Sequence, residues 1–70
     1  MTTQPFTIEV VWPDRKVETW KKADRQGSAR ADARVAYRWH RDRGMLVRRT
    51  RVRYRGLSTD EVVYSYPDGG

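Results

Sequence analysis

The chain has 70 residues, with 15 lysines and arginines against nine aspartates and glutamates, and a formal net charge of +6. The lack of cysteine excludes a disulfide framework, a thiolate metal site and a cysteine nucleophile, and the single histidine, His40, excludes a site with paired histidine ligands. A chain of this length forms one small domain, and its aromatic content of 11% is too high for a disordered basic tail.

The first element is a predicted β-hairpin. Residues 6–12 alternate with a period of two, Pro13 and Asp14 begin a turn, and residues 17–22 form the return strand. We expect Trp12 to pair with Val17, which places Trp20 on the outer side of the hairpin, near Glu9 and Glu18. The expected core face then carries Phe6, Ile8, Val10, Trp12, Val17 and Thr19.

A helix follows, and Ser28 is its expected N-cap. The helix should begin near Ala29 and end at Arg43 and Gly44, a cation followed by a residue that tolerates a left-handed backbone. We expect Trp39 to be the main anchor of the helix on a sheet and His40 to pack at the edge of the contact. The expected apolar side carries Ala29, Ala33, Val35, Ala36 and Trp39.

Two further strands are predicted at residues 46–55 and 61–66, separated by a loop at residues 56–60. In the first of them, alternation places Leu46, Arg48, Thr50, Val52 and Tyr54 on one face and Val47, Arg49, Arg51, Arg53 and Arg55 on the other. In the last strand Val62, Tyr64 and Tyr66 oppose Val63 and Ser65, and the pattern leaves open which set is buried.

The element order predicts a small α+β domain of the ββαββ type over residues 5–67, with frayed ends at residues 1–4 and 68–70. We expect a four-stranded, largely antiparallel sheet with the helix packed across one face. The other face is then available to water or to a partner.

The uncovered face is the candidate binding surface. Residues 44–55 carry five positive charges and no negative charge, whereas residues 56–70 carry three negative charges. Alternate arginines on a strand are about 6.6–7 Å apart, a spacing comparable to that of successive phosphates, which guanidinium groups bind in a bidentate manner. The predicted site for nucleic-acid or partner binding is Arg49, Arg51, Arg53, Arg55 and Trp20, with Trp20 available to stack on a base.

Other interpretations of this pattern remain open. Arginines on an exposed strand also prevent edge pairing, and Glu9 or Glu18 could pair with Arg49 or Arg51 and hide the charge. A different function class is a small accessory or inhibitor protein, of bacterial or phage origin, that docks on an acidic protein surface or dimerises through the same Arg/Trp/Tyr face.

The helix carries a secondary basic face, formed by Arg30, Arg34, Arg38 and Arg41. Such a stripe is typical of a solvated helix surface, although it can also enter a major groove. The expected helix, from about Ala29, has no asparagine or glutamine that would read adenine, so sequence-specific recognition is not expected.

No enzymatic activity, cofactor or metal site is expected, because no phosphate-binding glycine loop or metal-ligand spacing is present. No apolar segment approaches the ~20 residues of a membrane-spanning helix, and residues 1–5 lack the order of a signal peptide. We therefore expect a cytoplasmic protein without membrane contact.

Overall fold

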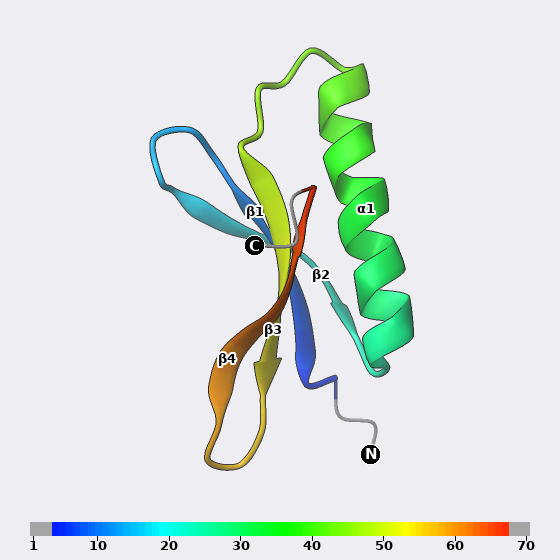
Figure 1. Ribbon diagram of the computed structural model, residues 1–70, viewed down its shortest axis with the longest axis vertical. Helices are drawn as coiled ribbons and strands as arrows, with labels where there is room; N and C mark the ends of the chain where they lie inside the picture. Colours follow the sequence, from blue (N-terminus) through cyan, green and yellow to red (C-terminus); the bar gives the residue numbers. More distant parts are fainter. Residues whose placement is uncertain (1–3, 68–70) are drawn as a thin grey trace.

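The computed structural model describes residues 4–67, in which one helix lies along one face of a four-stranded antiparallel sheet (Figure 1). This confirms the predicted α+β class and the ββαββ order. Apart from Gln4, the expected frayed ends lie outside the described residues. The elements are β1 (Phe6–Val11), β2 (Val17–Ala23), α1 (Gln26–Asp42), β3 (Arg49–Arg55) and β4 (Asp60–Tyr66).

The strand order in the sheet is β2-β1-β3-β4, so the two hairpins lie side by side with β1 and β3 at the centre. The two central strands are antiparallel neighbours, and Glu9 of β1 is directly opposite Arg51 of β3. The order therefore brings a carboxylate from the first strand into the middle of the arginine-rich strand.

Small side chains allow α1 to lie close to the sheet. Ala29, Ala33 and Ala36 are fully buried, and they face a core that includes Ile8 and Val52. The buried hydroxyl of Thr50 also donates a 2.6 Å hydrogen bond to the carbonyl oxygen of Ala33. A residue larger than alanine on this side would force the helix away from the strands.

The helix differs from the prediction at its start and in its anchor. It begins at Gln26 rather than Ala29, and its N-cap is Arg25, which provides no side-chain hydrogen bond. Trp39 is not the anchor: it is 39% exposed and lies against the Arg43 guanidinium, 3.9 Å from the ring centroid. The alanines form the contact instead, as their complete burial in the core cluster shows.

His40 packs at the boundary of the core, as expected. Its ring is buried and lies edge-on to Trp12, with ring centroids 5.4 Å apart. Its Nδ1 is 2.7 Å from the carbonyl oxygen of Ala36, which can only accept, so Nδ1 is the protonated nitrogen. At the helix end Gly44 has a φ of +76°, which confirms the predicted left-handed residue.

The register of the first hairpin differs from the prediction by one residue. Val11, not Trp12, is opposite Val17, and Glu9 is opposite Thr19. A one-residue shift moves every side chain of a strand to the other face. Val17 and Thr19 therefore lie on the uncovered face rather than in the core, while Trp20 packs against the core cluster.

The last strand also has an irregular register, and it resolves the open question about its faces. A bulge lies where Arg53 is opposite Val62 and Val52 is opposite Tyr64. As a result Val63 and Tyr64 both pack against the core cluster, and Ser65 is opposite Arg51 on the uncovered face. Neither of the two alternating sets is buried as a whole.

The turn of the first hairpin contains a strained residue. Arg15 has a φ of +74°, in the left-handed region that glycine adopts without cost. A side chain there destabilises the folded state by about 1–2 kcal/mol. Glycine avoids this cost, but its greater backbone freedom stabilises the unfolded chain by about 0.5–1 kcal/mol. We expect Arg15→Gly to raise the free energy of unfolding by about 0.5–1 kcal/mol, measured by urea titration.

The neighbouring Lys16 provides a matched control for this prediction, because its backbone is not left-handed. Lys16→Gly should lower the free energy of unfolding by about 0.5–1 kcal/mol. Equal losses of stability in the two variants would contradict the left-handed conformation of Arg15.

Candidate nucleic-acid interface

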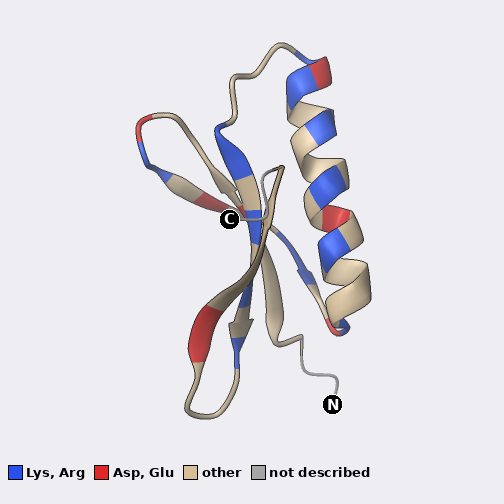
Figure 2. Cartoon of the chain, in the orientation of Figure 1, with Lys and Arg blue, Asp and Glu red and all other residues tan. Residues whose placement is uncertain are grey.

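The predicted arginines of β3 lie together on the face of the sheet that α1 does not cover. The register with β1 places Arg49, Arg51 and Arg53 opposite Val11, Glu9 and Thr7, whose neighbours Ile8 and Val10 face the helix. Figure 2 shows the basic residues following one another along this strand. We call this surface the arginine face, and its cationic strand residues are Arg49, Arg51, Arg53 and Arg55.

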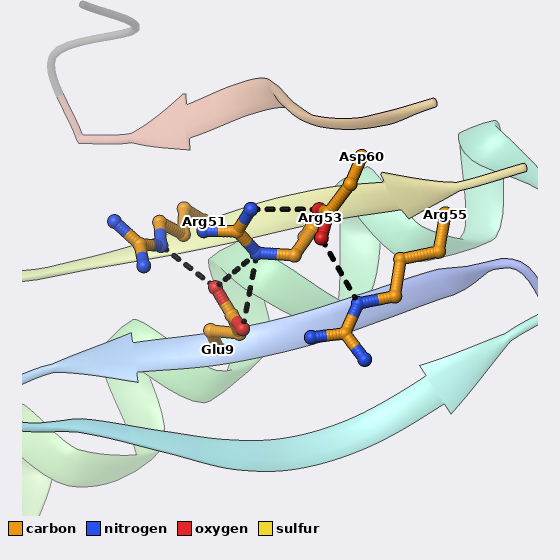
Figure 3. Close-up of polar contacts among 5 residues, drawn as sticks. All are labelled: Glu9, Arg51, Arg53, Arg55 and Asp60. Atoms are coloured by element: carbon orange, nitrogen blue, oxygen red, sulfur yellow. Dashed lines mark hydrogen bonds and ion pairs between the residues drawn. The ribbon is translucent and has the colours of Figure 1, made fainter. Parts of the chain in front are cut away.

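Glu9 is held between two of these arginines (Figure 3). The Arg51 Nε donates a 2.7 Å hydrogen bond to the Glu9 carboxylate, and the Arg53 Nε donates to both carboxylate oxygens at 3.3 and 3.4 Å. The Glu9 side chain is only 9% exposed, so its charge requires these partners. The cross-strand pairing predicted as an alternative is therefore present for Glu9 and Arg51.

Asp60 forms a second carboxylate link farther along the strand. The Arg53 Nη1 donates to it at 2.8 Å, and the Arg55 Nε lies 3.6 Å from its other oxygen. The hydrogen bond from Arg53 lowers the pKa of Asp60, and the same hydrogen bond raises the pKa of Arg53. The contribution of this pair to stability is present above the unfolded-state pKa of Asp60 and is lost as the pH falls through the lowered value.

Two hollows flank this chain of ion pairs at opposite ends of the arginine face. One, of about 330 Å³, is polar and includes Thr7, Lys22 and Arg55 in its lining. The other, of about 270 Å³, lies where the turn of the first hairpin meets the start of β3. We call it the arginine pocket, and its lining residues are Val11, Arg15, Val17, Arg48, Arg49 and Arg51.

Sequence reasoning missed two residues of the arginine pocket. Arg48 was expected on the helix-facing side, but β3 begins only at Arg49, and the Arg48 backbone N–H donates instead to the Val11 carbonyl oxygen at 2.9 Å. Alternation does not apply to a residue outside the strand. Arg15 lies in the turn, and only the pairing of distant strands brings it beside Arg48.

Trp20 does not belong to the arginine face, contrary to the prediction. The shifted register directs it toward the core cluster on the helix side of the sheet. Glu18 is likewise not beside Glu9, because it is opposite Val10. Among the described strand positions, the uncovered face therefore carries arginines, a lysine, two carboxylates, valines and small polar side chains, without an aromatic ring.

The secondary basic residues of the helix are exposed, and three of them contact tyrosines. The Arg34 Nη1 donates to the Tyr64 hydroxyl at 3.4 Å, while the Arg30 and Arg41 guanidinium carbons lie 5.6 and 5.5 Å from the ring centroids of Tyr64 and Tyr37. These contacts orient the arginines along the flank of the helix next to β4. These helix arginines lie on the opposite side of the sheet from the arginine face.

Within residues 4–67 no cluster of histidine, aspartate and glutamate has the arrangement of a metal site, and no helix there is long and apolar enough to cross a membrane. Comparison of the chain with protein-family models, with curated proteins and with solved structures finds no match. The functional argument therefore depends on the geometry of the arginine face.

Proposed function

We propose that this protein is a non-enzymatic module that binds nucleic acid by contacting its phosphate backbone with the arginine face, with little sequence preference. The observation that carries the proposal is the row of four arginines on the uncovered side of a central strand. Arg15 and Arg48 extend the cationic surface at one end, and Lys22 extends it at the other.

The ion pairs support this proposal as well as limit it. Glu9 and Asp60 hold Arg51 and Arg53 in fixed orientations, which reduces the entropy that these side chains lose on binding. Each carboxylate also cancels one positive charge. The net attraction for phosphate therefore depends on the excess of arginines and lysine over these two carboxylates.

The location of Trp20 bears on the kind of nucleic acid. Proteins that prefer single strands stack bases on aromatic side chains, and the described strand positions of the arginine face have none. A duplex carries a higher charge density than a single strand. We infer that duplex is bound more tightly than single-stranded nucleic acid of the same length.

The lack of an aromatic ring at the described strand positions of the arginine face also favours nucleic acid over a protein partner there. Hot spots in protein interfaces are rich in tryptophan and tyrosine beside arginine. Trp20 and Tyr64 pack against the core on the helix side, and Tyr54 is opposite Phe6 there. The arginine face offers mainly charge, which a polyanion requires.

The test is a fluorescence anisotropy titration with labelled duplex and single strand of both DNA and RNA at about 50 and 200 mM salt. We expect micromolar dissociation constants at the lower salt and a roughly 10- to 100-fold loss of affinity at the higher salt. Absence of binding even at the lower salt would overturn the proposed function.

The variant for this test is Arg49→Gln/Arg55→Gln, which leaves both arginine partners of Glu9 in place. We expect weaker binding to all sequences alike and a salt slope reduced by about two. The matched control is Arg34→Gln/Arg38→Gln, which removes the same charge from the helix. Equal weakening by the two double variants would indicate attraction by net charge alone.

A further inference from the structure

The arginine pocket concentrates positive charge at one end of the arginine face. Four of its six lining residues are arginines, the other two are Val11 and Val17, and none is a carboxylate. Glu9 and Asp60 pair with arginines of β3, and one of these is the pocket residue Arg51. The excess positive charge of the pocket therefore depends chiefly on Arg15 and Arg48.

Two of the pocket arginines come from outside the strands. Within residues 4–67 neither Arg15 nor Arg48 forms an ion pair with a carboxylate. The Arg48 backbone is fixed by its hydrogen bond to Val11, and the first hairpin holds Arg15 at the turn. Both residues thus line the same hollow as Val11 and Val17.

The backbone of Arg15 gives an independent reason to assign a function to the pocket. A residue with positive φ in a hairpin turn is most favourably glycine or asparagine. The long cationic side chain at this position makes the turn less stable than glycine would. Strain of this kind is typical of residues that contribute to a binding site.

We propose that the arginine pocket binds a terminal phosphate group of a nucleic acid, an inference that rests on the proposed function. A phosphate monoester carries about 1.5 to 2 negative charges at neutral pH and has three strong acceptor oxygens, whereas an internal phosphodiester carries a single charge. A hollow lined by four arginines, of which Arg15 and Arg48 pair with no carboxylate of residues 4–67, matches the more highly charged group.

The experiment compares three internally labelled oligonucleotides of the same sequence. The first has no terminal phosphate, the second has a phosphate on its first nucleotide, and the third has a phosphate on its last nucleotide. At about 50 mM salt we expect a terminal phosphate at one end or both to tighten binding about tenfold. Arg15→Gly and Arg48→Gln should each reduce this preference to about twofold or less, and each should weaken binding to the unphosphorylated oligonucleotide only by the loss of one positive charge.

Arg15→Gly separates binding from folding, because this variant is expected to be more stable than the parent protein. Arg38→Gln, which removes an exposed helix arginine, is the control and should keep the preference unchanged. Equal binding of all three oligonucleotides, or a preference that survives both pocket variants, would overturn the pocket assignment and leave the proposed function standing. A lack of binding to all three would overturn both.

Discussion

Glu9→Gln is expected to tighten nucleic-acid binding about three- to tenfold at low salt and, at the same time, to lower the free energy of unfolding by about 1–3 kcal/mol. The substitution keeps the shape of the side chain and an acceptor oxygen for Arg51 and Arg53 but removes the negative charge between them. The two guanidinium groups then attract phosphate without a competing carboxylate. Anisotropy titration measures the first effect and urea unfolding measures the second.

Glu18→Gln is the matched control for this prediction. Glu18 carries the same charge, but its strand partner is Val10 and it therefore lies on the opposite side of the sheet from Glu9. It should change affinity much less than Glu9→Gln and leave stability within about 0.5 kcal/mol. Equal gains in affinity from the two variants would indicate that only net charge matters and that the arginine face is not the binding surface.

Trp20→Ala is expected to lower the free energy of unfolding by about 2–3 kcal/mol without a specific effect on nucleic-acid affinity. The half-buried ring packs against a core that is otherwise built largely from alanine, valine and isoleucine. A domain of this length has a total stability of roughly 3.5–10 kcal/mol, so the loss is a large fraction of it. The measurement is the urea midpoint compared with that of the parent protein.

Two further variants complete this test. Leu57→Ala changes a fully exposed side chain in the β3–β4 loop and should alter stability by less than about 0.5 kcal/mol. Trp20→Phe retains most of the packing, so its nucleic-acid affinity can be measured on a folded protein. A clear loss of affinity in Trp20→Phe with unchanged stability would show that Trp20 lies on the arginine face, as the sequence pattern alone predicted.

The error at Trp20 has a specific physical origin. The sequence analysis assumed a turn that pairs Trp12 with Val17, whereas the backbone N–H of Trp12 donates to the Lys16 carbonyl oxygen at 2.9 Å, and the shorter loop ends with Arg15 in a left-handed conformation. The alternation of side chains along one strand gives no information about its register with a neighbouring strand. The register also shifts at Ile8 and Glu9, and this second irregularity returns Lys22 to the predicted face, opposite Thr7.

The arginine face was predictable because it depends on one strand. The period of two separates Arg49, Arg51, Arg53 and Arg55 from Thr50 and Val52 whichever strand lies beside them. The small side chains on one side of the helix were predictable for a similar reason, because they follow the helical period within one segment. Which apolar residue would anchor the helix was not predictable, because the burial of Ala33 and the exposure of Trp39 depend on how the helix lies on the sheet.

By itself, the sequence determined the order of the elements, the common face of the four β3 arginines and the end of the helix at Gly44. These features arise from backbone preferences and side-chain periodicity within single segments. The tertiary structure alone decided the strand order β2-β1-β3-β4, and with it the burial of Glu9 between Arg51 and Arg53 and the approach of Arg15 to Arg48. Those contacts join residues from separate elements, so they exist only after the sheet has paired and the helix has covered one of its faces.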